Sequence, residues 1–211
     1  MALIIRRRLQ NLVFQLPSVV EPIDLGELFS QAQPLEVELG CGDASFLAEY
    51  ARRHPEKNFI GVERLLGRIQ KLDRKGRRAG LANLRGVRIE SAYFLQFLLP
   101  RAAAEAVHIY FPDPWPKKRH HKNRMVNERF PSIAAAALVP GGTVYLRTDD
   151  KAYFEQMTEA FGAAKDFEKV ETPAELLEVT TDFEKGFLAR GIATRSAAYR
   201  LKGPVPSNRN S

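Results

Sequence analysis

The segment 35–42 reads LEVELGCG, and it determines which fold the chain can adopt. Its first five residues are a β-rich run, which Gly40 and Gly42 close. This pattern predicts a strand followed by a tight turn, where glycines let a ligand approach the backbone. Asp43 is expected to cap the next helix, which runs to about Arg53.

Predicted strands and helices alternate along the rest of the chain. The further strands are expected at residues 58–62, 87–89, 106–110, 143–147 and around 198–201. Further helices are expected at residues 65–79, 133–138 and 151–161. With no internal repeat and no linker, this alternation predicts one doubly wound α/β domain with a largely parallel sheet. The domain is expected to span residues 35–211, and residues 1–34 are interpreted as an N-terminal arm.

The second predicted helix, at residues 65–79, combines an apolar face with a strongly basic one, and Gly80 is expected to end it. The apolar side chains recur at helical spacing and are Leu65, Leu66, Ile69 and Leu72. The basic side chains of the other face are Arg64, Arg68, Lys71, Arg74, Lys75, Arg77 and Arg78. Such a face is usually only solvated, but here it also adds to a candidate RNA footprint.

The composition restricts the class of protein. A formal net charge of +7 favours an anionic partner, either nucleic acid or a membrane surface. A single cysteine excludes an internal disulfide framework and fits a reducing cytosol. No N-terminal run is apolar enough for a signal peptide or membrane span, so a cytoplasmic protein without a membrane partner is expected. The four histidines show no metal-ligand spacing, and no metal is predicted.

Acidic side chains stand at two predicted strand ends. Glu38 lies two residues before Gly40, and Glu63 follows Gly42 by 21 residues, where an acid can bind ribose hydroxyls. A dinucleotide-binding fingerprint would place a third glycine where Ser45 stands. An acid before the glycines instead suits S-adenosylmethionine, which carries a sulfonium and an α-amino group. Cys41 is interpreted as a small packing residue rather than a nucleophile.

The segment 107–124 reads VHIYFPDPWPKKRHHKNR, a predicted strand end followed by a cationic loop. Prolines on both sides of Asp113 restrict the backbone and should present its carboxylate in a stiff, extended segment. Residues 117–129 contain six Lys or Arg side chains and one acid, a density that suits phosphate. Trp115 and Tyr110 are candidate stacking surfaces for a base. The alternative is that Trp115 belongs to the core and the loop is only solvated.

The segment 111–124 resembles the signature of the bacterial tRNA guanine-N7-methyltransferases. Four other blocks match that family in order, and the resemblance extends from about residue 35 to residue 202. The blocks lie at residues 38–42, 61–63, 146–149 and 181–184. The resemblance implies a Rossmann-like class I methyltransferase that transfers a methyl group from S-adenosylmethionine to guanine N7 in the tRNA variable loop. Both a monomer and a homodimer remain open.

The family motifs also imply roles for individual residues. Asp113 matches the proposed catalytic acid. The residues expected at the cofactor are Glu38, Gly40, Gly42, Glu63, Ser91, Ala92 and Asp113. Those expected at the tRNA are Lys117, Arg119, His120, Lys122, Arg124, Asp149, Thr181, Asp182, Phe183 and Glu184. Three features depart from the family pattern. Ser91 stands in place of an aspartate, and Asp182 in place of a basic residue. The family's basic N-terminal segment has no clear equivalent, since Arg6-Arg7-Arg8 does not align clearly with it.

Three other functions are consistent with parts of the sequence. A catalytically inert RNA-binding module would keep the fold and the basic loop without needing S-adenosylmethionine. A nicotinamide-dependent oxidoreductase is disfavoured by Ser45, and a small-molecule methyltransferase leaves the cations of residues 117–129 unexplained.

Overall fold

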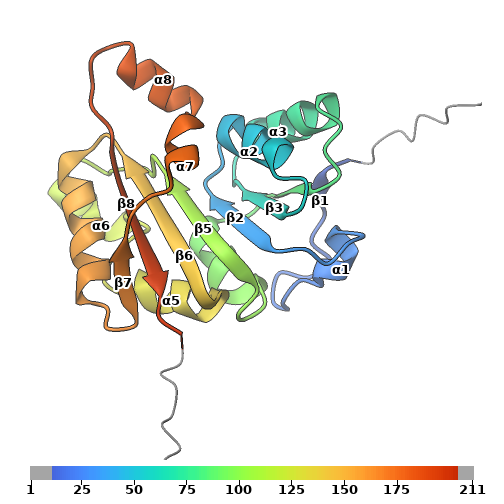
Figure 1. The fold of residues 1–211 in the computed structure, drawn as a ribbon, viewed down its shortest axis with the longest axis horizontal. Coiled ribbons are helices and arrows are strands. Elements are labelled where there is room, and N and C mark those ends of the chain that lie inside the picture. Colours follow the sequence, from blue (N-terminus) through green and yellow to red (C-terminus); the bar gives the residue numbers. More distant parts are fainter. Residues whose placement is uncertain (1–10, 204–211) are drawn as a thin grey trace, which may run out of the picture.

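A computed structural model describes residues 11–203 of the 211-residue chain. Its strands form one sheet in the order β1-β4-β3-β2-β5-β6-β8-β7 (Figure 1). Every neighbouring pair is parallel except the two that include β8, which runs antiparallel to β6 and β7. The strands are β1 (Val13–Phe14), β2 (Leu35–Leu39), β3 (Asn58–Val62), β4 (Leu84–Val87), β5 (Ala104–Tyr110), β6 (Leu138–Thr148), β7 (Phe167–Val170) and β8 (Arg195–Leu201).

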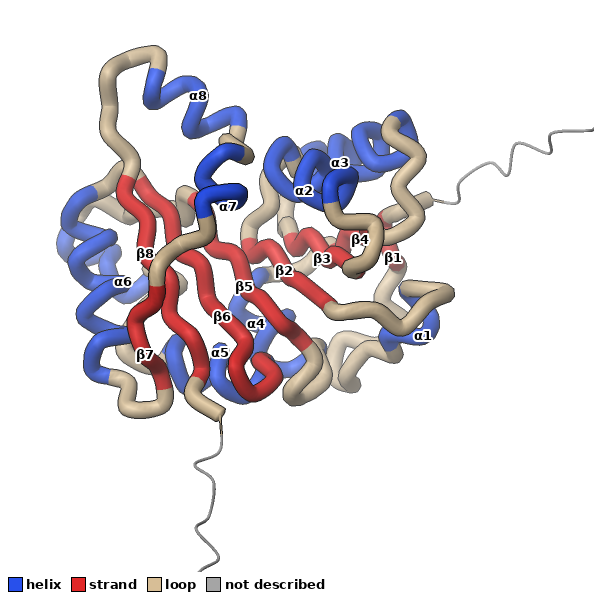
Figure 2. Tube along the Cα trace, in the orientation of Figure 1, coloured by secondary structure: helices blue, strands red, loops and turns tan. Residues whose placement is uncertain are grey.

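Helices cover both faces of this sheet (Figure 2). Side chains of α2 and α3 pack in one apolar cluster, and those of η1, α5 and α6 pack in a second, larger one. The helices are α1 (Leu25–Leu28), α2 (Ser45–Arg53), α3 (Leu66–Arg78), α4 (Ser91–Tyr93), the π-helical η1 (Phe94–Leu98), the 3₁₀-helical η2 (Lys118–Asn123), α5 (Phe130–Ala137), α6 (Lys151–Ala163), α7 (Ala174–Glu178) and α8 (Asp182–Leu188). Two cores separated by a mostly parallel sheet confirm the predicted doubly wound α/β fold.

Close packing against the sheet explains the glycine in the middle of β3. A Cβ atom built on Gly61 would lie 2.6 Å from Leu72 Cδ1 and 2.8 Å from Cys41 Sγ. Only a residue without a side chain therefore lets α2 and α3 approach β3 this closely. Cys41 is buried in the same cluster, as expected of a packing residue.

Several predicted element boundaries are wrong. Asp43 does not cap α2: the N-cap is Ala44, and the Asp43 carboxylate accepts from Ser45 N instead. Leu65 and Leu66 are exposed, because α3 begins at the carboxyl edge of the sheet and turns only its later residues inward. The third strand is β4, which ends at Val87, where the prediction had it begin. Helix α5 ends before residue 138, and residues 138–142 form the start of β6 rather than a loop.

The prediction of an N-terminal arm is wrong for the described part of residues 1–34. Strand β1 extends the sheet beside β4, and the Leu12 amide donates to the Asp73 carboxylate at 2.8 Å. Leu12, Ile23 and Leu28 are buried in the two cores, so this segment contributes to the fold. Burial of scattered apolar side chains gives no periodic signal, which is why the sequence pattern missed it. Residues 6–8 lie outside the described range.

Across residues 11–203, none of the helices has the length and apolar character needed to cross a membrane.

Candidate active site

A cavity of about 350 Å³ lies at the carboxyl edge of the parallel strands. The loops that follow β2, β3, β4 and β5 all contribute to its wall, as expected where parallel strands end together. The lining includes Leu39, Gly40, Glu63, Arg64, Leu65, Arg68, Glu90, Ser91, Phe111, Pro112, Asp113, Trp115, Asn123 and Met125. The cavity therefore brings together predicted cofactor residues from four separate segments of the chain.

The turn after β2 exposes its backbone to this cavity. Gly40 and Gly42 have φ values of +75° and +56°, in the left-handed region that favours glycine. Among residues 11–203, no heavy atom beyond the adjacent residues lies within 4 Å of the Cβ position of Gly40, whereas the Cβ position of Gly42 lies 3.9 Å from the Phe183 ring. Gly40 thus leaves room for a ligand, whereas a Cβ atom at Gly42 would make only an ordinary contact with Phe183, so its positive φ is what favours glycine there.

Glu38 is the most unusual acid of the site because it is buried without a cation in direct contact. Its side chain is 3% exposed, and Oε2 has no hydrogen-bond partner among residues 11–203. Burial raises the pKa of Glu38 well above its usual range, and the nearby carboxylates of Asp43 and Glu63 raise it further. The positive charge of Arg147 acts in the opposite direction. An unpaired buried acceptor of this kind calls for a donor from a ligand.

The ends of β3 and β4 carry two further acids. Glu63 is buried, accepts from Leu65 N at 2.8 Å, and lies 3.9 Å from Arg68. Glu90 caps α4 by accepting from Ala92 N and Tyr93 N at 3.0 and 2.7 Å. Ser91 lines the cavity as predicted, but the Ala92 amide is already engaged by Glu90.

Asp113 lies at the mouth of the cavity in a backbone segment with unusual geometry. Phe111 and Trp115 have φ values of +50° and +44°, a region that non-glycine residues rarely adopt. The Asp113 carboxylate is exposed and accepts from Trp115 N at 3.3 Å. Trp115 lines the cavity, and its ring meets His120 edge-on at 5.8 Å between centroids. Strain of this type is retained at functional sites when the surroundings enforce it.

The basic loop is mostly a surface, with one buried exception. Lys117, Arg119 and Lys122 are exposed, and His120 is half-buried. Arg124 was expected at the tRNA, but it is 3% exposed: Nε donates to Pro114 O at 2.7 Å, and an Nη donates to Gln156 at 2.8 Å. Its guanidinium also lies over the Tyr153 ring, 4.8 Å from the centroid. Arg124 therefore holds the Pro114 carbonyl, and its charge is not presented to phosphate.

Tyr110 is likewise not a stacking surface for a base. The ring is buried under α2, and its hydroxyl lies 2.9 Å from His108 Nδ1. His108 Nε2 in turn lies 2.7 Å from Glu36, which receives a second hydrogen bond from Lys57 at 2.7 Å. Burial raises the pKa of Glu36, but the hydrogen bonds and charges of His108 and Lys57 lower it to about 2. The sequence interpretation did not include this network, although alternation in β2 puts Glu36 on the same face as Glu38.

The segment from α7 to α8 lies over the turn after β2. Thr181 caps α8, and the Asp182 amide donates to Ser45 Oγ at 2.9 Å. The Asp182 carboxylate lies 3.6 Å from Lys75 and 3.3 Å from Lys185, so an acid is favourable at this position. Phe183 is 52% exposed beside Gly42, and Arg68 lies over its ring.

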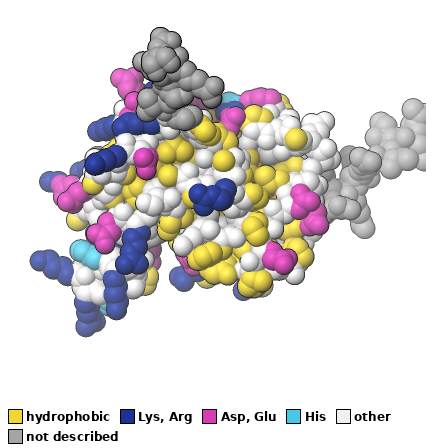
Figure 3. Space-filling view, turned by 90° about the horizontal axis from the view of Figure 1, so that it is seen from below, with side chains coloured by type: hydrophobic (Ala, Val, Ile, Leu, Met, Phe, Trp, Pro, Cys, Tyr) yellow, Lys and Arg dark blue, Asp and Glu magenta, His cyan; other side chains and the backbone are white. Residues whose placement is uncertain are grey.

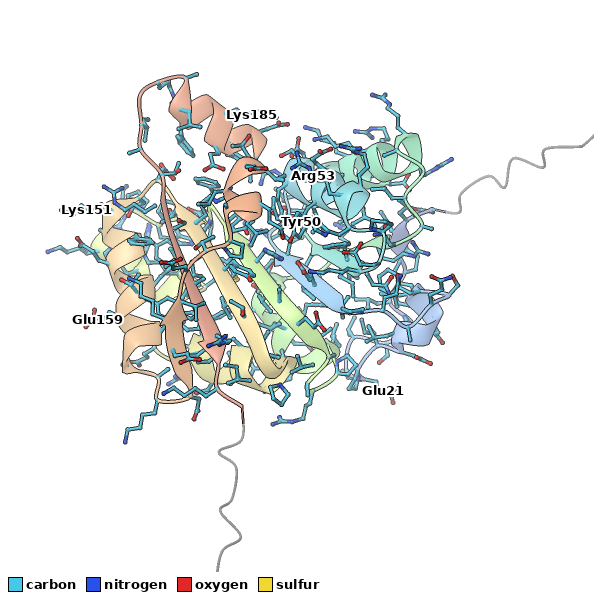
Figure 4. The ribbon with its side chains drawn as sticks, in the orientation of Figure 1. Glu21, Tyr50, Arg53, Lys151, Glu159 and Lys185 are labelled. Carbon is cyan, nitrogen blue, oxygen red and sulfur yellow. The ribbon has the colours of Figure 1, made fainter. Side chains whose placement is uncertain are left out.

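Two regions of the fold hold this segment in place. In α2, Tyr50 and Arg53 face α7 (Figure 4), where Tyr50 donates to Glu175 at 3.2 Å and Arg53 lies 3.8 Å from Glu178. From β6, the buried Arg147 pairs with Glu184 and donates to the carbonyls of residues 176 and 179. Thr181 and Glu184, both expected at the tRNA, are therefore buried in the attachment of this segment to the sheet.

Asp149 lies at the carboxyl end of β6 and is half-buried, beside the same edge of the sheet as the cavity. Asn123 and Met125 line the cavity, although the sequence interpretation assigned them no role. Their position within the basic loop of residues 117–129 was the available signal. Among residues 11–203, no group of three or more His, Cys, Asp or Glu side chains is arranged to hold a metal ion.

Known proteins identify the family of this chain. Residues 32–195 match the family described as "Putative methyltransferase". The chain is 36% identical over 185 residues to a tRNA (guanine-N(7)-)-methyltransferase of Halorhodospira halophila, covering 85% of this chain and 80% of that protein. A protein of the same name from Alkalilimnicola ehrlichii is 34% identical over 190 residues, with 88% and 80% covered. The chain belongs to the tRNA (guanine-N(7)-)-methyltransferase family.

Relatives within this family differ in length. A Thermotoga maritima tRNA (guanine-N(7)-)-methyltransferase is 38% identical over 146 residues, which are 69% of this chain but only 47% of that protein. The shared region therefore corresponds to about half of that relative.

Solved structures show the class of fold. The 16S rRNA methyltransferase KamB has a TM-score of 0.59 at 16% identity, covering 87% of this chain and 95% of that one. The 30S ribosomal A1408 methyltransferase UncKam has a TM-score of 0.58 at 15% identity, with 87% and 96% covered. At such identities the likeness concerns the fold alone, and it confirms the class I methyltransferase architecture predicted for this family member.

Proposed function

We propose that this protein transfers a methyl group from S-adenosylmethionine to N7 of a guanine in the tRNA variable loop. The observation that carries the proposal is that Asp113 lines the same cavity as Gly40 and Glu63. The family relationship supports the reaction type, since the relatives named above are tRNA (guanine-N(7)-)-methyltransferases.

The residues at the cavity fit S-adenosylmethionine. Glu38 is not among the residues that line the cavity, but it lies in β2, whose end does, and its unpaired oxygen is an acceptor suited to the cationic amino-acid part of the cofactor. Gly40 lines the cavity and leaves the backbone open to close approach. Glu63 lines the cavity after β3, and its carboxylate is an acceptor suited to ribose hydroxyls. When bound, S-adenosylmethionine supplies an electrophilic methyl group on a sulfonium.

Guanine N7 needs no general base, because it carries an in-plane lone pair and no proton. The protein's contribution is therefore alignment of the base and stabilisation of the charge that methylation puts on the ring. The exposed Asp113 carboxylate can accept from guanine N1–H and N2–H₂ and so stabilise that charge. Trp115, at the cavity wall, offers a ring against which a base displaced from its stack can pack.

The test is methyl transfer from labelled S-adenosylmethionine to unmodified tRNA, followed by nucleoside analysis. Label is expected in 7-methylguanosine. Asp113→Ala and Asp113→Asn should both lower turnover by about 100- to 1000-fold, the range found when a charge-stabilising group is removed, with little change in tRNA affinity. Asp166→Asn, at an exposed aspartate before β7, is the matched control and should leave turnover unchanged.

Two results would contradict the proposal. Label in another nucleoside would overturn the assignment of guanine N7. Salt-sensitive tRNA binding with no methyl transfer would favour the catalytically inert RNA-binding module instead.

A further inference from the structure

Positive charge is concentrated in two segments of this chain. Residues 64–78 contain seven Lys or Arg side chains and one acid, for a net +6, and residues 117–129 carry a net +5. The whole chain has a formal net charge of +7, so everything outside these two segments is net acidic. The basic character of the protein is therefore a property of two local surfaces, not of the whole molecule.

These two segments lie on either side of the candidate active site. Arg64, at the start of the first segment, and Arg68, in the first turn of α3, line the cavity from one side. Trp115, just before the basic loop, and Asn123, within it, line the cavity from the other side. A polyanion with one nucleotide in the cavity would therefore have a basic surface on each side of that nucleotide.

Four of the seven basic side chains of residues 64–78 are not neutralised by ion pairs with residues 11–203. Lys75 pairs with Asp43 and Asp182, Arg77 with Asp73, and Arg68 is 3.9 Å from Glu63. Across residues 11–203, no carboxylate lies within ion-pair distance of the four others, which are Arg64, Lys71, Arg74 and Arg78. All four are exposed.

This arrangement is unfavourable for the isolated helix. Like charges three and four residues apart repel, and α3 contains such pairs in every turn, for example Lys71 with Arg74 and Arg74 with Arg78. Asp73, the one acid of the helix, is already engaged by the Leu12 amide and Arg77. A helix that retains this density of unpaired cations is expected to meet an anionic partner.

We infer that the outer face of α3 is a second tRNA-binding surface, which binds backbone phosphates while the basic loop binds near the target nucleotide. At a rise of 1.5 Å per residue, residues 64–78 extend about 20 Å away from the cavity, enough to follow several phosphates. The inference rests on the proposed function, because it takes tRNA as the substrate. It assigns α3 to affinity and orientation, not to chemistry.

The opposite side of the molecule provides a control surface. Seen from below, away from α7 and α8, the middle and right of the molecule carry few Lys and Arg side chains, which gather towards the left of the view (Figure 3). Arg101 precedes β5, Lys165 precedes β7, and Lys169 lies in β7; all three are exposed. Their replacement removes three charges at a distance from the cavity.

The experiment compares two triple variants with equal loss of charge. The first is Lys71→Gln, Arg74→Gln and Arg78→Gln, none of which lines the cavity; the second is Arg101→Gln, Lys165→Gln and Lys169→Gln. Dissociation constants for unmodified tRNA are measured between 50 and 300 mM salt (roughly the range in which phosphate contacts dominate), and S-adenosylmethionine affinity is measured by calorimetry. A charge-conserving triple, Lys71→Arg, Arg74→Lys and Arg78→Lys, tests for misfolding.

The α3 variant should bind tRNA about 10- to 100-fold more weakly, with the slope of log K against log salt reduced by about 2 to 3. Its KM for tRNA should rise, while its affinity for S-adenosylmethionine should match wild type, as should tRNA binding by the charge-conserving triple. Equal weakening in the α3 and control triples, or an unchanged salt slope, would overturn the inference. Failure of the proposed function is distinguishable, because then the wild-type protein itself forms no 7-methylguanosine.

Discussion

Arg147 provides the sharpest test of how the segment over the site is held. Its side chain is 1% exposed, and its guanidinium donates to Leu176 O at 2.6 Å, to Val179 O at 3.2 Å and to the Glu184 carboxylate. Arg147→Met keeps much of the apolar volume but leaves Glu184 buried without its cation. Loss of one partner from a buried ion pair typically costs about 3–5 kcal/mol.

The expected loss lies near the lower end of that range. Glu184 keeps the hydrogen bond that it accepts from Thr194 Oγ1 at 3.0 Å. This bond compensates part of the stabilisation that is lost with the Arg147 guanidinium. A loss of about 3 kcal/mol corresponds to a decrease in melting temperature of roughly 6–12 °C for a chain of this size. Hydrogen exchange should also rise in α7 and α8, since the two carbonyl contacts of Arg147 belong to that segment.

The assay is urea denaturation of Arg147→Met, Glu184→Gln and the double variant. The double variant should be less destabilised than the sum of the two single variants, because Glu184→Gln removes the orphaned charge. Arg200→Met is the matched control: Arg200 pairs with Glu168 at 2.7 Å, but both side chains are about half exposed. That pair should contribute less than about 1 kcal/mol. If Arg147→Met cost no more than Arg200→Met and left α7–α8 exchange unchanged, the reasoning would be refuted.

Three further substitutions test the buried acids and the packing of β3. Burial raises the pKa of Glu38 above its usual 4.5, so the folded protein favours the protonated side chain and loses stability as pH rises from 4.5. Glu38→Gln should therefore melt at a higher temperature than wild type at pH 8, with a smaller difference at pH 5. Measured by calorimetry, Glu38→Gln should bind S-adenosylmethionine about 10- to 100-fold more weakly. The pKa of Glu36 is lowered to about 2, so its contribution of about 3 kcal/mol to the free energy of unfolding should be lost as pH falls from 4.5 to 2. In acid titrations the stabilities of Glu36→Gln and wild type should therefore converge over this pH range. A stability difference that stays constant with pH would contradict this prediction. Gly61→Ala should lower the free energy of unfolding in urea by about 1–3 kcal/mol, because its Cβ would overlap Leu72. The control Gly67→Ala lies in open space on α3 and should be neutral or stabilising. Equal effects of the two substitutions would contradict the packing argument.

Predictions from local pattern succeeded where the signal lies within a few neighbouring residues. The runs at 35–39, 58–62 and 106–110 are strands, and Glu63 and Asp113 line one cavity because parallel strands end at one edge of a sheet. The roles expected of Arg124 and Tyr110 were wrong for a different reason. Both side chains are buried by residues distant in the chain, and no local pattern reports that.

The sequence by itself determined the alternation of strands and helices, the class of fold and the acids at the strand ends, since each depends on short-range periodicity and on chain order. Only the tertiary structure decided which charges are buried. Arg147 meets Glu184, 37 residues away, and Glu36 meets His108, 72 residues away. A buried charge is stable only when a partner and hydrogen bonds compensate for lost water, and such partners come from the folded arrangement of distant segments.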